Sequence, residues 1–168
     1  MEEQQTFLSQ LEQGPLHEFI IEVRGYAGEL TIEVAPHHLF EVMKILKEMF
    51  AFNYLSDITA SDHYSDEKRF EVSYNIASLS NKQRLRISVH LEEDKPEIDS
   101  ITSLWTSANW YEREAYDMMG IQFNGNEDLR RIYMPEDFDY FPLRKEFPLL
   151  GIPGTIQLPE KDPPKEYK

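Results

Sequence analysis

The sequence predicts an α+β fold of two layers. A mixed or antiparallel sheet carries its helices on one face, and an extended, proline-rich tail follows at the C-terminus. Several short runs alternate apolar with polar residues, which is typical of half-buried strands. One run near residue 40 instead repeats its apolar residues at helical spacing. Six of the ten prolines lie after Tyr140, where neither a helix nor a central strand can form.

The N-terminal part predicts a hairpin and a helix. Residues 2–12 can form a short polar helix. Period-two alternation over residues 17–24 resumes over residues 30–34 after a glycine-containing turn, so these runs are expected to form a β-hairpin. Pro36 suits the first position of a helix, and apolar residues recur at helical spacing from there to Phe50.

The middle of the chain predicts three more strands. Residues 54–59 are expected to form a strand that runs into a polar loop. Residues 70–76 and 85–91 alternate clearly and predict adjacent antiparallel strands. Residues 92–96 break the sheet, and the apolar residues at 98–105 indicate the start of a helix that continues into the next segment.

The domain division follows from length and composition. A chain of 168 residues is large enough for one domain that buries roughly 70% of its unfolded surface. We predict an α/β sandwich domain over residues 1–125 and an extended docking tail over residues 126–168. Apolar residues in the tail favour a segment that lies along another surface over a disordered one. These residues are Leu143, Phe147, Leu149, Leu150, Ile152, Ile156 and Leu158.

Composition excludes several classes of function. Lys and Arg total 17 against 31 for Asp and Glu, and a net charge of -14 opposes binding to nucleic-acid phosphates. The absence of cysteine excludes disulfides, thiolate zinc sites and cysteine-ligated iron–sulfur clusters within this chain. There is no apolar run of eighteen residues and no signal-peptide pattern, so we expect a soluble or peripheral protein that stays where it is made.

Residues 109–148 contain the most informative side chains. Glu112, Arg113, Glu114 and Asp117 lie on a short amphipathic helix that ends at Gly120, and Arg113 can pair with Asp117 four residues on. Acidic groups near a helix C-terminus oppose the helix dipole, which predicts that these carboxylates face cations elsewhere. The nearest cations in sequence are Arg130, Arg131, Arg144 and Lys145.

The carboxylates have a second interpretation as a metal or acid–base site. Glu114 and Asp117, three residues apart, can share a hard cation, and with Asp128 they would define a small carboxylate-dependent hydrolase. Salt bridges are the favoured interpretation, and we expect the isolated chain to bind no divalent cation. The five histidines lack ligand spacing, and no nucleophile elbow or phosphate-binding glycine loop is present.

Arginine and aromatic side chains together favour an interface, because interfaces are enriched in both. Pairing of the arginines with the helix acids is an alternative that can coexist with docking, and a catalytic anion site is a third. Arg131→Ala is expected to weaken assembly while the isolated domain stays folded. The predicted docking residues are Trp110, Glu112, Arg113, Glu114, Asp117, Asp128, Arg130, Arg131, Tyr133, Arg144 and Lys145.

The same stretch resembles a known family. The run ERE-x-x-D-M-x-G-I-x-F, followed by D-L-R-R-I-x-M-P-E-D-F and P-L-R-K-E-F-P, is similar to the C-type subunits of the respiratory NADH:quinone oxidoreductase, complex I. Their cyanobacterial and chloroplast counterparts are the J-type subunits. Two positions depart from the family pattern: Asn126-Glu127 replaces a frequent His-Pro, and Tyr140-Phe141 replaces a frequent Gly-His. No role of those histidines is transferred to this chain.

The resemblance implies a cofactor-free structural subunit of the hydrophilic arm, which supports electron transfer from NADH to quinone and the coupled proton translocation. It implies docking against the large quinone-site subunit and its iron–sulfur neighbour, with FMN and the iron–sulfur clusters on partner subunits. The isolated chain would not be catalytic. Membrane association would occur only through the complex, on the cytoplasmic face of the inner membrane, or on the stromal or cytoplasmic face of the thylakoid in the photosynthetic type. The alternative is the equivalent subunit of a membrane-bound hydrogenase or another quinone-reducing dehydrogenase.

Overall fold

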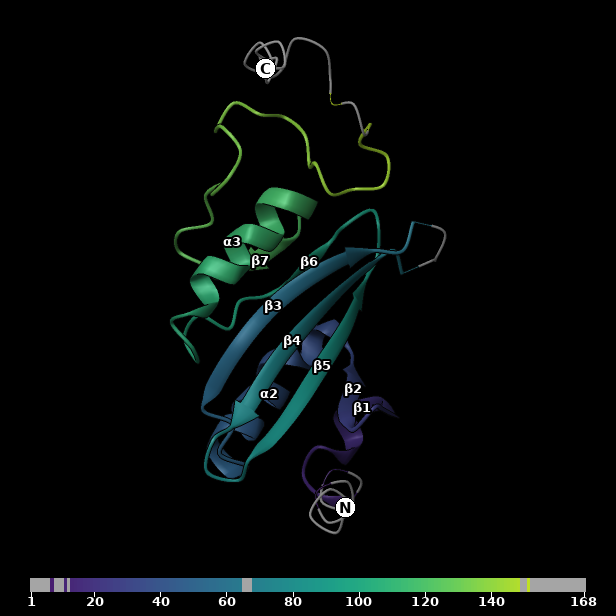
Figure 1. Ribbon diagram of the computed structural model, residues 1–168, viewed down its shortest axis with the longest axis vertical. Helices are drawn as coiled ribbons and strands as arrows, with labels where there is room; N and C mark the ends of the chain where they lie inside the picture. Colours follow the sequence, from purple (N-terminus) through teal and green to yellow (C-terminus); the bar gives the residue numbers. More distant parts are fainter. Residues whose placement is uncertain (1–6, 8–10, 12, 65–67, 149–150, 152–168) are drawn as a thin grey trace, which may run out of the picture.

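A five-stranded mixed sheet forms the framework of the domain (Figure 1). The computed structural model describes residues 7, 11, 13–64, 68–148 and 151. The strand order is β1-β2-β5-β4-β3, in which β2 and β5 are parallel and all other neighbours antiparallel. The strands are β1 (Ile20–Tyr26), β2 (Glu29–Val34), β3 (Tyr54–Asp62), β4 (Phe70–Ser78) and β5 (Gln83–Leu91). The mixed sheet and the α+β class confirm the predicted fold.

Two α-helices in the described part of the chain complete the core. α2 (Leu39–Met49) follows the 3₁₀ turn η2 (Pro36–His38), and α3 (Ala108–Met119) packs along β3. A second, two-stranded parallel sheet joins β6 (Glu97–Asp99) to β7 (Gln122–Asn124) on either side of α3 in sequence. The 3₁₀ turn η1 (His17–Phe19) precedes β1.

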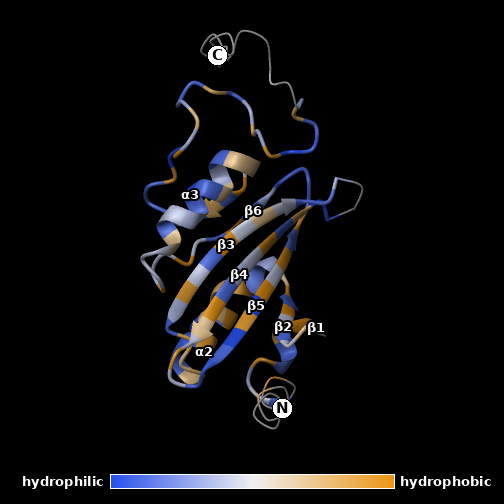
Figure 2. Cartoon of the chain, in the orientation of Figure 1, coloured by the Kyte–Doolittle hydropathy of each residue, from blue (hydrophilic) through white to orange (hydrophobic). Residues whose placement is uncertain are grey.

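The sheet buries one face because its strands alternate. Along β4, Phe70, Val72, Tyr74 and Ile76 are buried, whereas the residues between them stay partly exposed. Val72 pairs with Val89 of the antiparallel β5. Figure 2 shows the same alternation as orange and blue bands along β3, β4 and β5. The antiparallel pairing predicted for these two runs is confirmed.

Three local predictions need correction. The helical periodicity assigned to residues 98–105 is wrong: Ile98 lies in β6 and pairs with Phe123, and α3 begins only at Ala108. A long-range hydrogen bond helps to set the conformation of this segment: the indole N–H of Trp105 donates to the carbonyl of Asn53 at 3.1 Å. Residues 17–19 form η1 instead of the first residues of the strand, and the strand predicted over 54–59 continues to Asp62.

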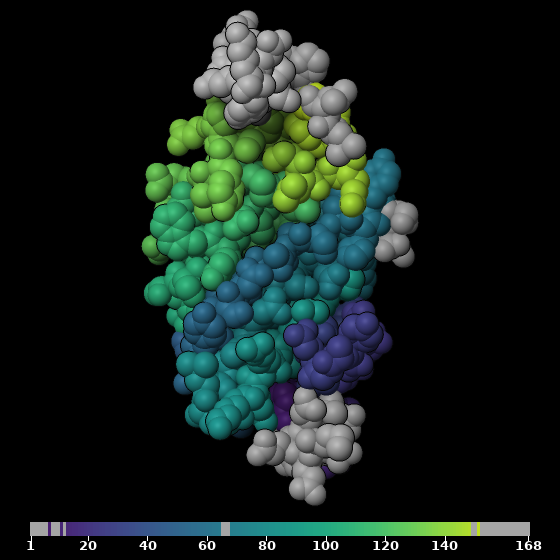
Figure 3. Space-filling model, viewed as in Figure 1, coloured from purple at the N-terminus to yellow at the C-terminus, as the bar shows by residue number. Residues whose placement is uncertain are grey.

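The ends of the chain are described only in part. The helix predicted for residues 2–12 lies outside the described residues except for Phe7 and Leu11, both of which are buried in the core. Residues 126–148 contain no helix or strand and cover the end of the domain beside α3, where Figure 3 shows them in green to yellow. The tail prediction for residues 149–150 and 152–168 lies outside the described residues. No helix in the described part of the chain is long and apolar enough to span a membrane.

Candidate partner-docking site

Asp117 on α3 binds the segment that follows β7. Its Oδ2 accepts hydrogen bonds from the backbone N–H groups of Ile132, Tyr133 and Met134 at 3.0, 2.7 and 3.0 Å. Its Oδ1 accepts one from Arg131 at 2.7 Å, in an ion pair that is almost fully buried. Burial alone would raise the pKa of this carboxyl, but the four hydrogen bonds lower it on balance. The prediction that this acid faces an arginine is therefore confirmed.

Glu112 is buried one and a half turns earlier on α3 and pairs with no cation among the described residues. Its oxygens accept hydrogen bonds from the Ser100 hydroxyl, the Ile101 N–H and the Asn126 amide, each at 2.8 Å. Burial raises the pKa of Glu112, and these three bonds offset only part of the shift. The prediction of a cation partner is wrong here, because the helix face at Glu112 points into the domain. The position that departs from the family pattern, Asn126, supplies one of the donors.

Arg113 does not pair with Asp117, its predicted neighbour on the helix. Its guanidinium donates to the carbonyls of Arg130 and Arg131 at 3.1 and 3.3 Å and lies 3.7 Å from Asp128. The indole of Trp110 stacks on the same guanidinium, 4.9 Å from its centre to the ring centroid. Arg130 and Arg131 therefore both bind α3 through their carbonyls, and only Arg131 also binds it through its side chain, since the Arg130 side chain pairs with Asp128.

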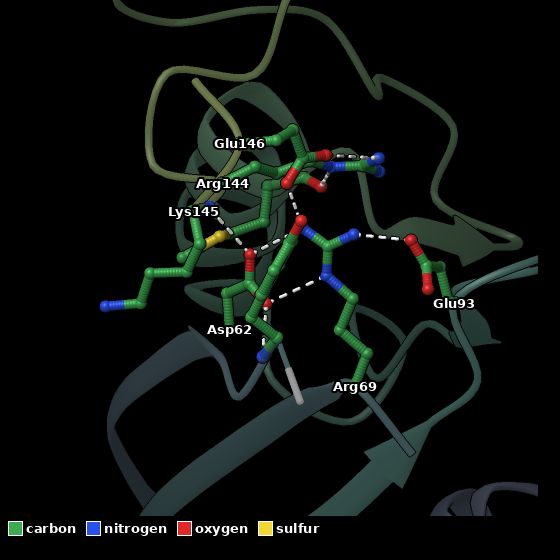
Figure 4. Close-up of polar contacts among 8 residues, drawn as sticks. Asp62, Arg69, Glu93, Arg144, Lys145 and Glu146 are labelled. Carbon is green, nitrogen blue, oxygen red and sulfur yellow. Dashed lines mark hydrogen bonds and ion pairs between the residues drawn. The ribbon is translucent and has the colours of Figure 1, made fainter. Parts of the chain in front are cut away.

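A second cluster joins the start of β4 to the C-terminal segment (Figure 4). Arg69 is 2% exposed and donates two hydrogen bonds to Asp62, at 2.8 and 2.7 Å, and one to Glu93 at 2.6 Å. It also donates to Glu146, and the Lys145 N–H donates to Asp62 at 2.8 Å. The Arg69 guanidinium holds the pKa of Asp62 well below its usual range, although burial opposes the shift. This cluster fixes residues 145–146 onto the sheet.

Sequence reasoning missed Asp62, Arg69, Glu93 and Glu146. The available signal was the end of the β3–β4 hairpin, where Asp62 is the register partner of Phe70 and so lies beside Arg69. The strand predicted over 54–59 stopped too early to show this pairing.

Arg144 connects the two clusters. Its Nε donates to the carbonyl of Met119 at 2.7 Å, and its guanidinium stacks on the rings of Phe70 and Phe141 at 5.0 and 4.7 Å. The close approach requires Gly120, which has φ +75°. A Cβ on Gly120 would lie 2.6 Å from Phe141 and 2.7 Å from the Arg144 guanidinium. The helix stop predicted at Gly120 thus also makes room for the returning chain.

The structure divides the predicted docking residues by exposure. Glu112, Arg113 and Asp117 are buried within the chain, and Asp128, Arg131 and Arg144 are partly buried. The exposed members are Trp110, Glu114, Arg130, Tyr133 and Lys145. Glu114 and Asp117 do not converge, since Glu114 is exposed while both oxygens of Asp117 receive donors from the protein. No group of three or more metal-ligating side chains lies together among the described residues.

Fold and site together define a class of protein: an α+β domain whose buried ionisable groups hold its own C-terminal segment in place and leave aromatic and basic groups on the outer surface. The comparison with family models narrows this class. The family described as respiratory-chain NADH dehydrogenase, 30 Kd subunit, matches residues 32–152, and the chain belongs to it.

Individual relatives agree with this assignment. The C-type subunit of the NADH-quinone oxidoreductase of Geotalea uraniireducens is 44% identical over 146 residues, which cover 87% of this chain and 85% of that protein. The trypsin-resistant fragment (1-134) of Nqo5 superposes with a TM-score of 0.66 at 29% identity over 76% of this chain and 99% of the fragment. A chain of the membrane-bound sulfane sulfur reductase, an archaeal respiratory membrane complex, shares the fold at a TM-score of 0.74, with 22% identity and 89% and 88% coverage.

The chain is therefore a hydrophilic-arm subunit of NADH-quinone oxidoreductase, complex I, and its partners are other subunits of that complex. The family resemblance carried by residues 112–148 is confirmed.

Proposed function

We propose that this chain is a cofactor-free docking subunit, which holds the quinone-site and iron–sulfur subunits of complex I in place for electron transfer from NADH to quinone. The isolated chain would have no catalytic activity, because FMN and the iron–sulfur clusters would lie on partner subunits. It would sit on the cytoplasmic face of the membrane, attached only through the complex. Family membership and the geometry of the site support this proposal.

One observation supports docking most directly: two large aromatic side chains are exposed on a part of the chain that buried polar contacts hold in place. Trp110 and Tyr133 are 62% and 61% exposed. The Trp110 ring is stacked on Arg113 and the backbone of Tyr133 is bonded to Asp117, so the Trp110 side chain and the Tyr133 backbone are already held in place before a partner binds. Pre-ordered aromatic residues beside arginine are the groups that contribute most binding energy at interfaces.

The buried members of the predicted set would act as positioning residues. Asp117 and Arg113 orient the segment 130–134 without reaching a partner themselves. For this reason Arg131→Ala is a poor test of docking: it would leave the buried Asp117 carboxylate without its cation and destabilise the isolated domain. Substitution of the exposed aromatic residues avoids this problem.

The test is an affinity pull-down of the N-terminally tagged chain from mildly solubilised native membranes. We expect the unmodified chain to recover the quinone-site and iron–sulfur subunits together with NADH:quinone activity. The double variant Trp110→Ala/Tyr133→Ala should recover about tenfold less of both. Met49→Ala, which removes a side chain of 66% exposure at the end of α2, is the matched control and should recover them normally. Equal recovery of the partner subunits by all three chains would refute docking through this surface. Recovery of hydrogenase subunits in their place would show that the complex takes its electrons from a donor other than NADH.

A further inference from the structure

A groove opens at the end of the sheet opposite the C-terminal segment. The turn between β1 and β2 and the connection between β4 and β5 line the same hollow there, and Figure 3 shows these parts of the chain in its lower half in indigo and teal. Between them is a hollow of about 450 Å³, and a second hollow of about 420 Å³ continues it across the strand ends. The two hollows share Glu29, Leu30 and Arg84, so they form one groove.

The charge of the groove is opposite to that of the chain. Its charged lining residues are three bases, Lys82, Arg84 and Arg86, and one acid, Glu29, in a protein of net charge -14. Arg86 donates to Asn75 and Glu29. Lys82 and Arg84 are exposed and make no ion pair within the described part of the chain. A carboxylate from another molecule is the complementary partner for these two side chains.

Apolar side chains surround the same groove. Tyr26, Tyr54 and Leu79 are 87%, 50% and 71% exposed, and all three line the two hollows. Phe7 and Leu30 line the hollow between the turns. Exposed aromatic and aliphatic groups around a basic centre fit a segment that presents carboxylates and at least one apolar side chain.

The backbone of Lys82 gives an independent indication. Lys82 has φ +51°, a left-handed conformation in which a glycine would be relaxed and a side chain is strained. A lysine at this position stabilises the turn less than a glycine would, yet it places an ammonium group at the rim of the groove. Strained positions of this kind gather at sites that bind other molecules.

We propose that this groove docks an acidic, apolar segment of a neighbouring subunit of complex I. The inference rests on the proposed function and extends it, because neither Trp110 nor Tyr133 lines this groove. The chain would then contact its neighbours through two separate surfaces.

The test uses carbodiimide coupling, which joins an amine directly to a carboxylate in contact with it, on the purified whole complex. Mass spectrometry should find Lys82 coupled to an Asp or Glu of another subunit. Lys95, which lies 2.5 Å from Glu97 of the same chain, reports that the reaction has worked. Lys82→Arg keeps the charge but has no amine, so it should assemble normally and lose the cross-link. Arg84→Glu should lower the yield of the Lys82 cross-link about tenfold, because it places a like charge beside the incoming carboxylates.

Other outcomes would overturn the inference. If Lys82 in the complex is uncoupled and acetylated as readily as in the isolated chain, the groove is empty, although the proposed function stands. If Lys82 is shielded but uncoupled, its occupant is not acidic. Coupling to Glu2 or Glu3 would show that this chain's own N-terminal residues fill the groove. Failure of the chain to enter the complex at all would refute the proposed function instead.

A measurement on the isolated chain checks the strain argument separately. Lys82→Gly should raise the melting temperature, since glycine adopts φ +51° without strain, while it removes the cross-link in the complex. A lower melting temperature would show that the Lys82 side chain serves folding, and the argument from strain would fail.

Discussion

Asp117→Asn tests whether one buried carboxylate holds residues 131–134 in place. The substitution keeps the shape of the side chain and removes its charge. In the native chain, four hydrogen bonds converge on the two carboxylate oxygens, three from consecutive backbone N–H groups and one from Arg131. An asparagine offers one oxygen to these donors and points its NH₂ group at the others, so at least one buried donor loses its acceptor.

The magnitude follows from burial. Asp117 is fully buried and the Arg131 side chain is 10% exposed, so neither group regains full hydration when the pair is broken. Removing one partner of a buried ion pair costs about 3–5 kcal/mol in free energy of unfolding. Asp139→Asn is the matched control: it makes the same change at an exposed aspartate of the same segment and should cost less than about 0.5 kcal/mol.

The assay is urea unfolding of the full chain by circular dichroism, repeated over a range of pH. The pKa of Asp117 is lowered from its ordinary value of 3.8, so the ionised form stabilises the folded state. This stabilisation is fully present above pH 3.8 and is lost as the pH falls through the lower pKa of the folded state. The difference between the native chain and Asp117→Asn should therefore be constant near neutrality and shrink below pH 3.8. A difference no larger than that of the control, or one that does not change in acid, would refute the reasoning.

Two further predictions concern the other buried groups. Arg69→Met should lower the free energy of unfolding by roughly 3 kcal/mol in urea titration, because Asp62 stays buried without its cation. Arg24→Met, the control at an exposed ion pair, should change the free energy of unfolding by less than about 1 kcal/mol. Equal effects of the two substitutions would contradict the role of the Arg69 cluster. Glu112→Gln leaves one of three buried donors without an acceptor but also removes a buried charge, so the two effects oppose and the variant should be within about 1 kcal/mol of the native chain at neutral pH. Because burial raises the pKa of Glu112 above 4.5, the native chain loses stability as the pH rises from 4.5 through the folded-state pKa. The Gln variant should lack this loss and Glu114→Gln should keep it, and an unchanged pH profile in Glu112→Gln would count against the raised pKa.

The sheet could be predicted from sequence because its information is local. Alternation along residues 70–76 and 85–91 depends only on which face each side chain meets, and a period of two is visible in any short window. β6 is three residues long and exists because it pairs with β7 across α3, so no local pattern reveals it. The apolar residues at 101–105 form hydrogen-bonded turns, in which the Trp105 N–H donates to the Ile101 carbonyl at 3.0 Å, but these turns do not continue into a helix until Ala108.

For the candidate site, the sequence predicted some of the residues that take part but not how they contact one another. The sequence identified α3 and the arginines, but not which of them meet. Arg69 gathers carboxylates that lie 7, 24 and 77 residues away, and such distances are set by the completed fold. Glu112 and Asp117 look alike in sequence, yet one is bonded by neutral donors and the other by an arginine. The difference arises from what the fold places opposite each face of the helix.

These contacts imply that the buried groups stabilise the folded chain, whereas the exposed groups are the ones expected to contact other subunits. Residues 126–148 lack the hydrogen-bonded ladder of a helix or strand, so their order has to come from side chains, and Asp117, Arg113 and Asp62 accept or donate to their backbone. A change at one of these buried groups should therefore alter stability and assembly together, and at Asp117 and Asp62 the effect on stability should disappear in acid. A change at the exposed Trp110 or Tyr133 should alter assembly alone. Measuring unfolding and subunit recovery on the same variants separates the two groups, and a buried variant that affects assembly without any loss of stability would show that its side chain reaches a partner after all.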